Sequence, residues 1–451
     1  MMRYIFLIFA LIFTACSLKT NTNEVLNQTN FEMNSRSKHY AKLDFEQNLS
    51  LLPVSKEFFK NDGKTYKKYF FSAWHSDFRN LNSKNLFWSF EAYLNKNNKY
   101  YFFNKQIIPK SWFEKNIINA NISALGSINK KALVIKNTLL KNFPTQGLIL
   151  KNPFKEGEGI PFDYAIDNIL NIGSPVLISH LTKDKRYAFV RFENSFGFIQ
   201  TDALEIFSEH RTKIYENLNF ITPLFEKMPV FDEKGRYFFE TRIGAIYPYY
   251  KSDKEYYYGK IGENKYKIAK DKAANFPLEF NDLHLKHQLS EVLNLPYGWG
   301  GYSFERDCSL LTHDIFVPFG LYMPRNSLAQ NNAFSHFDIS FLSNTQKKEF
   351  LKNFAKPYLS LLYLKGHIML YVGSFKDKEL AIHSIWGLRK SESKRLLISR
   401  SVITGLEIGK DEIPDENLLL SKLKEISFIR LEESEKTRIK DYLSKFKKQN
   451  F

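Results

Sequence analysis

The chain has 451 residues, and 16% of them are aromatic, including 42 Phe and 25 Tyr, which is enough for several folded domains with substantial cores. Lys and Arg outnumber Asp and Glu by 65 to 48, which gives a net charge of +17 and indicates anionic partners. The basic residues are spread along the chain and no nucleic-acid-binding motif is present, so nucleic acid is excluded as the expected partner. Two cysteines are too few for a disulfide framework.

The N-terminus has the layout of an export signal. Arg3 precedes a short apolar run that ends in small residues, and this run is too short to span a bilayer comfortably. Residues 13–16 resemble a bacterial lipoprotein cleavage box. We therefore interpret residues 1–15 as a signal peptide and Cys16 as an acylated N-terminus. An ordinary signal peptide that contains a cysteine is the alternative. Ser17 favours the outer membrane over the inner one.

No other apolar stretch reaches the roughly 18 residues that a membrane helix needs. Residues 16–40 are rich in Asn, Thr and Ser, which is typical of a flexible tether. The expected location is thus the periplasmic face of a bacterial membrane, through a lipid anchor. For such a protein, the basic charge favours cell-wall polymers or membrane headgroups as partners. We expect a monomer.

The middle of the chain changes from helical to strand-like patterns. Helices are predicted at Ser83–Lys96 and Pro109–Ile118. Short strands at close spacing indicate a small β-barrel, and a looser second set indicates another. One larger β-domain is the alternative. The predicted strands of the first barrel are 174–180, 187–192 and 196–200, and those of the second are 236–240, 245–250 and 256–261.

Cys308 has the surroundings of a nucleophile. A thiol reacts as the thiolate, and its pKa falls at a helix N-terminus and beside an imidazole. Three glycines, at positions 298, 300 and 301, indicate a loop before Cys308, and residues 309–316 after it form a helical pattern. Asp307 and Ser309 favour a helix start. A helical pattern at 281–293 marks the beginning of this last domain.

Two histidines are predicted to supply the base. Residues 366–373 and 380–387 are strand-like, and the segment between them is turn-like. His367 and His383 are equidistant from residue 375 within that turn, so they should face each other, or nearly so, on one face of a hairpin. We assign His367 as the base that takes the thiol proton and His383 as the residue that orients it.

A zinc site made by Cys308, His367 and His383 is the alternative use of these side chains. The glycine loop favours a nucleophile, so no metal and no cofactor are expected. His284 and His287 have the spacing of metal ligands, but no further ligands accompany them. We expect ordinary structural roles for His180, His284, His287 and His313.

Several short segments together resemble the NlpC-type, papain-like cysteine peptidases of bacterial cell walls. Upstream, residues 143–145, 157–164 and 174–176 resemble the subgroup in which a stabilising N-terminal domain and two bacterial SH3-like barrels precede the peptidase. Leu310 stands where relatives usually have Gly. The segments of the peptidase resemblance are Tyr297–Gly301, Asp307–Ser309, Met323–Ser327, Gly366–Gly373 and Ile382–His383.

The resemblance implies an α+β fold, with a papain-like C-terminal peptidase domain preceded by two small SH3-like β-barrels and a mixed, mainly helical N-terminal domain. The implied boundaries are a signal peptide at 1–15, the lipidated Cys16 and tether at 16–40, an N-terminal stabilising domain at 41–158, barrels at 159–212 and 213–278, a peptidase domain at 279–435 and a charged helical tail at 436–451.

The implied activity is that of a peptidoglycan hydrolase, a γ-D-glutamyl-meso-diaminopimelate endopeptidase acting on wall stem peptides or muropeptides with a free N-terminal L-Ala. The resemblance places Tyr297 near the oxyanion site with the Cys308 N–H. It makes Asp307 and Ser309 candidates for binding the L-Ala amine. The alternatives are an amidase or transpeptidase on the same fold, a non-catalytic wall-binding lipoprotein, and a signalling or adhesion lipoprotein that binds peptides through its barrels.

Overall fold

The computed structural model describes residues 40–79, 81, 83–155 and 157–447. The predicted signal peptide, the predicted acylation site Cys16 and nearly all of the predicted tether lie outside these residues. The described residues from 41 to 447 belong to one compact unit. Within the described residues, no helix combines the length and the hydropathy that a membrane span requires.

The N-terminal region is mainly helical. The helix predicted at Pro109–Ile118 is confirmed as α5. The helix predicted at Ser83–Lys96 is interrupted at Phe87, whose backbone is not helical and whose ring lies 4.7 Å from that of Phe189. The Trp74 indole donates to two carbonyls of the first barrel, at 3.0 and 3.1 Å, and so joins the two regions. The helices are η1 (Leu49–Leu51), α2 (Lys64–Phe70), η2 (Ser72–His75), α3 (Ser83–Leu86), α4 (Trp88–Leu94), α5 (Lys110–Asn119) and η3 (Ile122–Ala124).

The first barrel is a seven-stranded antiparallel sheet in the order β3-β2-β6-β5-β4-β1-β7. Its first strand begins at Lys130, upstream of the domain boundary predicted at residue 159. Its first two strands fill the barrel core, with Ala132 and Leu140 fully buried, but each is too short to show a clear alternation. The strands are β1 (Lys130–Val134), β2 (Thr138–Lys141), β3 (Ile166–Leu170), β4 (Pro175–Leu181), β5 (Tyr187–Phe192), β6 (Ser195–Gln200) and β7 (Leu204–Ile206).

The second barrel consists of three small sheets that follow η4 (Thr201–Ala203) and α6 (Glu209–Glu216). One hydrophobic cluster spans both barrels, and the Tyr215 hydroxyl donates to the carbonyl of Gly173 at 2.8 Å. The two barrels therefore have separate sheets but share one hydrophobic core. The strands are β8 (Asn219–Pro223), β9 (Pro229–Phe231), β10 (Tyr237–Glu240), β11 (Tyr247–Tyr249), β12 (Lys251–Ser252), β13 (Tyr256–Ile261), β14 (Asn264–Ala269) and β15 (Ala273–Asn275).

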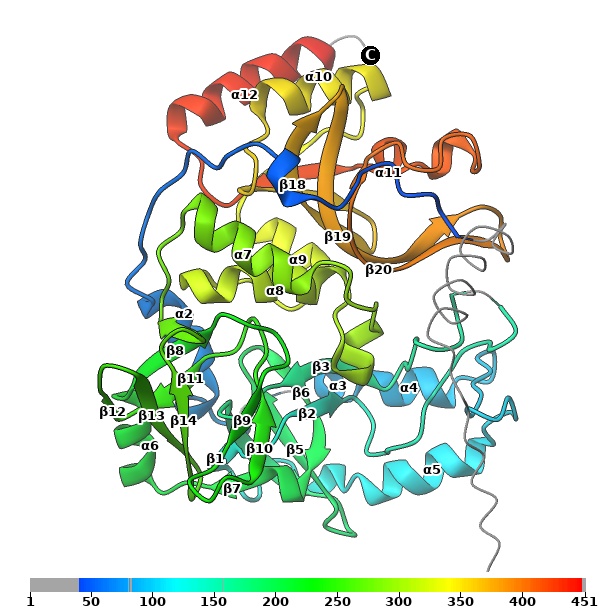
Figure 1. Ribbon diagram of the computed structural model, residues 1–451. Helices are drawn as coiled ribbons and strands as arrows, with labels where there is room; N and C mark the ends of the chain where they lie inside the picture. The colour runs from blue at the N-terminus through cyan, green and yellow to red at the C-terminus, as the bar shows by residue number, and fades with distance from the viewer. Residues whose placement is uncertain (1–39, 80, 82, 156, 448–451) are drawn as a thin grey trace, which may run out of the picture. The chain divides into compact units, whose positions relative to one another are not determined.

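The C-terminal domain has a six-stranded antiparallel sheet in the order β16-β21-β17-β18-β19-β20, with helices on both faces (Figure 1). The strands are β16 (Ser335–Asp338), β17 (Ser360–Leu364), β18 (His367–Phe375), β19 (Lys378–Arg389), β20 (Arg395–Gly405) and β21 (Glu425–Phe428). The helices are α7 (Asp282–Val292), η5 (Trp299–Phe304), α8 (Cys308–Phe316), η6 (Val317–Phe319), α9 (Ser327–Asn332), α10 (Asn344–Phe354), η7 (Asp415–Asn417), α11 (Leu419–Lys422) and α12 (Glu433–Lys447).

Alternation along β18 assigns the helices to the two faces of the sheet. Ile368 and Leu370 pack with α7 and α8 in one cluster, and Met369 packs with α10 and α12 in another. Ile439 and Leu443 of α12 are buried there. The described residues of the predicted tail, from 436 to 447, thus pack on the core of the C-terminal domain. Helix α8 lies between this sheet and the barrels (Figure 1).

Candidate active site

Cys308 is the first residue of α8, at the positive end of the helix dipole. Asp307 caps this helix, because its carboxylate accepts the Leu310 N–H at 2.9 Å and the Gly300 N–H at 3.0 Å. Gly300 has φ +63°, and a Cβ there would lie 2.3 Å from the carbonyl oxygen of Ile166 in the first barrel. The glycine loop is therefore in close contact with the first barrel. This contact and the Asp307 cap position the start of α8.

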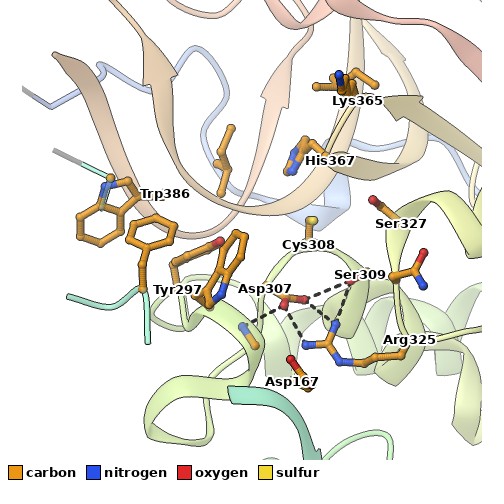
Figure 2. A pocket seen from close by; sticks show the side chains of 18 of the residues that line it. Asp167, Tyr297, Asp307, Cys308, Ser309, Arg325, Ser327, Lys365, His367 and Trp386 are labelled. Carbon is orange, nitrogen blue, oxygen red and sulfur yellow. Dashed lines mark hydrogen bonds and ion pairs between the residues drawn. The ribbon is translucent and has the colours of Figure 1, made fainter. Parts of the chain in front are cut away.

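Arg325, in the loop before α9, forms an ion pair with Asp307. Its guanidinium donates to both oxygens of that carboxylate, at 3.1 and 2.8 Å, and to Ser309 Oγ at 2.9 Å. Its Nε donates to Asn168 of the first barrel at 3.0 Å. A single side chain thus joins α8 to β3. Figure 2 shows the bonds of Arg325 to Asp307.

His367 and His383 are in direct contact, with 2.8 Å between His367 Nε2 and His383 Nδ1. This confirms the prediction that they nearly face each other. His367 lines the same cleft as Cys308, and Figure 2 shows its ring beside the sulfur. Because Nε2 of His367 is engaged by His383, Nδ1 is the nitrogen left for the thiol.

A β-bulge puts both histidines on one face. The turn is made by Lys376 and Asp377, which both have positive φ, and it lies later than the predicted midpoint. With this turn alone, the histidines would lie on opposite faces, since His367 is nine residues before it and His383 six after it. The register shifts by one residue between Tyr371 and Gly373, and this restores the common face.

Thr404 extends the chain of hydrogen bonds. Its Oγ1 lies 3.0 Å from Nε2 of His383, which is fully buried. If Nδ1 of His367 is to accept a proton, its Nε2 must donate to His383, and His383 must then donate to Thr404. The hydroxyl of Thr404 therefore fixes the tautomer that a base at His367 requires.

The thiol and both imidazoles are uncharged at rest. Burial raises the pKa of Cys308 to about 12, and the Asp307 charge adds to this, while backbone N–H groups of Ile368 and Ser309 act in the opposite direction. Burial lowers the pKa of His367 to about 4. Burial and the neighbouring His367 lower the pKa of His383 well below its usual value. At rest, the proton therefore lies on the thiol and not on the imidazole of His367.

The site lies in a cleft of about 880 Å³ with walls from the C-terminal domain and the first barrel. Tyr297 lines it, and burial, with the charge of Asp307, raises the pKa of its hydroxyl well above 10. The hydroxyl stays protonated and can donate. Asp167 of β3 also lines the cleft, and burial raises its pKa to about 6. Its carboxylate accepts a hydrogen bond from the Asn142 amide at 3.0 Å.

The residues predicted from the sequence as catalytic or substrate-binding lie at the cleft or directly behind it. Asp307 was expected to offer its carboxylate to an ammonium group. Its oxygens instead accept from Gly300, Ser309, Leu310 and both terminal nitrogens of Arg325, because it serves as the helix cap. Asp167 has the freer carboxylate.

Three residues of the site were missed from the sequence. Arg325 lies within a segment that carried the family resemblance, so a role could have been sought there. Asp167 and Thr404 come from other strands and have no local signal. His284 and His287, with metal-like spacing, each bind a backbone carbonyl at 2.8 Å. In the described part of the chain, no group of three or more His, Cys, Asp or Glu is placed to hold a metal ion.

Three family models match the chain. The NLPC_P60 stabilising N-terminal domain matches residues 5–125, the SH3 domain of SH3b1 type matches 149–200 and the SH3 domain of SH3b2 type matches 209–254. The chain has the domain organisation of the multidomain NlpC/P60 proteins. The predicted α+β fold with two SH3-like barrels is confirmed.

Two solved structures extend this comparison. An NlpC/P60 endopeptidase from Photobacterium damselae subsp. piscicida is 20% identical with a TM-score of 0.73, over 87% of this chain and 99% of that one. An NlpC/P60 family protein from Bacillus cereus ATCC 10987 is 16% identical with a TM-score of 0.46, over 66% of this chain and 100% of that one. No curated protein matches the chain. The first likeness establishes the NlpC/P60 fold for nearly the whole described chain.

Proposed function

We propose that this protein is a cysteine peptidase of peptidoglycan that cuts the bond between D-Glu and meso-diaminopimelate in stem peptides. The observation that carries the proposal is the placement of Cys308 at the start of α8, in one cleft with His367, which is itself held by His383. An uncharged thiol, an uncharged imidazole and an orienting partner are the parts that thiol-dependent acyl transfer needs.

In this mechanism, Nδ1 of His367 takes the thiol proton as sulfur attacks the γ-carbonyl carbon of D-Glu. The Cys308 N–H and the Tyr297 hydroxyl donate to the developing oxyanion, and each such donor is typically worth about 3 kcal/mol. The imidazolium then protonates the departing amine as the C–N bond breaks. Water, deprotonated by His367, hydrolyses the thioester and regenerates the thiol.

The end of the cleft next to the first barrel supports selection of a free N-terminal amine. Asp167 presents a carboxyl group there whose pKa is raised to about 6 by burial, because the carboxylate loses hydration. An ammonium group would compensate this loss. The backbone of the first barrel and the glycine loop are in contact at this point. L-Ala with a free amine at the head of the stem is the group that fits.

The test is product analysis by mass spectrometry with L-Ala-γ-D-Glu-meso-diaminopimelate and its N-acetylated form. Release of L-Ala-D-Glu from the free amine, and at least tenfold slower release from the acetylated peptide, is expected. Release of L-Ala alone, or ligation to an added amine, would favour an amidase or a transpeptidase. Binding without cleavage would favour a wall-binding protein, and binding that survives removal of the peptidase domain would favour a peptide-binding adhesion or signalling role for the barrels.

We also propose that the protein is exported and lipid-anchored through Cys16, which is supported by the signal-like segment before it. Metabolic labelling with a palmitate analogue in a bacterial host should label the wild-type chain and not the Cys16→Ser variant. Equal labelling of the two would overturn the anchor.

A further inference from the structure

The connection between α4 and α5 carries apolar side chains into solvent. It folds back on itself as a short hairpin, which is closed by a hydrogen bond from the Phe102 N–H to the Gln106 carbonyl at 2.9 Å. Phe103 lies at the tip of this hairpin and is 68% exposed, and Ile107 on the returning arm is 56% exposed. These two side chains add nothing to the core of the N-terminal region.

A second segment, in the connection between β2 and β3, lies against this hairpin. Tyr101 and Leu150 exchange both of their backbone hydrogen bonds, at 2.7 and 3.0 Å. The ring of Phe154, which is 69% exposed, lies 6.3 Å from that of Tyr101. Tyr101 is also the direct cross-strand partner of Ile107, so their side chains share a face. The ammonium group of Lys105 lies 5.4 Å from the centre of the Phe154 ring. The two segments therefore form one surface.

This surface is basic. Residues 95–113 and 149–155 contain six Lys and no Asp or Glu, and with the flanking glutamates included, six Lys stand against three Glu. Within the described residues, the pair of Lys110 with Glu114 at 3.7 Å is the one salt bridge that these lysines form. We call Phe103, Ile107, Phe154 and the six lysines the apolar-basic surface. The lysines, all exposed, are Lys96, Lys99, Lys105, Lys110, Lys151 and Lys155.

Exposed apolar side chains that occur singly are ordinary, but this surface combines them with positive charge. An anionic bilayer binds such a combination, because aromatic and aliphatic side chains enter the headgroup region while lysines pair with lipid phosphates. A lipid on Cys16 would lie 24 residues before Tyr40, the first described residue. A chain of that length reaches up to about 80 Å, so the lipid alone would not orient the folded protein at the membrane.

We propose that the apolar-basic surface docks on an anionic phospholipid bilayer. The setting of this contact rests on the lipid anchor proposed above, while the contact itself involves the folded chain alone. Gly157 lines the active-site cleft and is three residues beyond Phe154, at most about 11 Å along the chain. The docked protein therefore holds its cleft next to the bilayer.

The test is sedimentation with vesicles of phosphatidylethanolamine and phosphatidylglycerol. It uses the chain from residue 17 onward, which lacks Cys16, carries no lipid and contains the whole compact unit. We expect binding that weakens with added salt and is much weaker on phosphatidylcholine alone. Phe103→Ser/Phe154→Ser should lower the partition coefficient at least about tenfold, because both rings lose their place in the headgroup region.

The charge is tested by Lys99→Gln/Lys105→Gln/Lys155→Gln. This variant should also lower partitioning at least about tenfold, since each basic residue near an anionic surface contributes about fivefold. Two control variants remove the same number of exposed apolar side chains and of charges elsewhere, and they should bind like the wild type. They are Ile214→Ser/Leu283→Ser and Lys234→Gln/Lys254→Gln/Lys390→Gln.

Equal losses in the surface variants and their controls, or unchanged binding by Phe103→Ser/Phe154→Ser, would overturn the proposal. Sedimentation with purified sacculi but not with vesicles, lost in both surface variants, would assign the surface to the cell wall and overturn it as well. Cleavage of soluble stem peptides should be the same in Phe103→Ser/Phe154→Ser as in the wild type, so failure of the docking and failure of the proposed activity are told apart.

A direct readout uses Phe103→Cys on the Cys308→Ala background, where residues 17–451 hold a single thiol. An environment-sensitive dye on that thiol should shift its emission to shorter wavelength when the anionic vesicles are added, and a dye on Leu283→Cys in the same background should not. Because Cys308 is absent, this result is independent of any cleavage. Equal shifts at the two positions, or none at position 103 while the protein is bound, would refute insertion of the hairpin tip.

Discussion

Replacement of Arg325 by Met is the substitution whose effect follows most fully from the site. It removes four hydrogen bonds, two of them to the Asp307 carboxylate. Breaking a buried ion pair from one side typically costs about 3–5 kcal/mol. The side chains of Arg325 and Asp307 are 17% and 13% exposed, and Asp307 keeps its other donors. We therefore expect the low end of that range, about 3 kcal/mol.

Thermal unfolding followed by circular dichroism measures this effect. For a domain of about 150–250 residues, such as the C-terminal domain, about 3 kcal/mol corresponds to a fall in melting temperature of roughly 6–12 °C. Arg325→Lys should fall between wild type and Met, because an ammonium group cannot donate to both carboxylate oxygens as a fork. As a control, Arg186→Met removes an exposed pair with Asp184, and exposed pairs contribute at most about 1 kcal/mol.

The double variant Arg325→Met/Asp307→Asn tests whether the Asp307 charge, left without Arg325, causes the loss of stability. It removes the carboxylate charge but keeps an oxygen that can cap α8, so its melting temperature should recover toward wild type. Activity at low temperature should fall in Arg325→Met beyond any unfolding, because Arg325 also lowers the pKa of Cys308. A shift below about 2 °C for Arg325→Met, or no recovery in the double variant, would refute this account of the pair.

Further predictions concern proton positions. Asp167 must be ionised to bind an ammonium group, so kcat/KM should fall as the pH drops through about 6, the raised pKa of Asp167. In Asp167→Asn, this fall in kcat/KM should move toward about pH 4, the pKa of His367. A fall that stays near pH 6 in the variant would contradict a role for Asp167. Because the pKa of Cys308 is raised to about 12, alkylation by iodoacetamide should rise about tenfold per pH unit from 7 to 9, whereas a plateau in that range would reveal a resting thiolate. Thr404→Val should lower kcat about tenfold by freeing the His383 tautomer, Thr404→Ser should restore it, and equal rates for the two would dismiss the relay.

The position of Cys308 at the start of a helix was predictable because its signals are local. Asp307 is a good helix cap, and Gly300 and Gly301 before it have the positive φ that glycine favours. The histidine pair was predicted by a simpler argument than the one the structure uses. The symmetric turn assumed from the sequence is displaced, and the bulge near Gly373 compensates for it. The predicted shared face is observed because the later turn and the bulge would each, alone, place the histidines on opposite faces, and the two effects cancel.

The remaining parts of the site depend on contacts between distant segments. Arg325 bonds Asn168, 157 residues earlier, and nothing in either local sequence specifies the partner. The limits of the first barrel were missed for a related reason, since β1 is an ordinary short apolar segment until it pairs with β4 and β7. The sequence of α12 is strongly charged, and Ile439 and Leu443 are its buried residues.

The measurement that tests the central claim most directly is the rate of L-Ala-D-Glu release from L-Ala-γ-D-Glu-meso-diaminopimelate by wild-type protein and by Cys308→Ala, prepared identically and shown by circular dichroism to be equally folded. The account predicts release by the wild type, with a transient mass increase on Cys308 equal to one L-Ala-γ-D-Glu acyl group, and no release by Cys308→Ala. Equal release by both proteins, or none by a folded wild type, would contradict it.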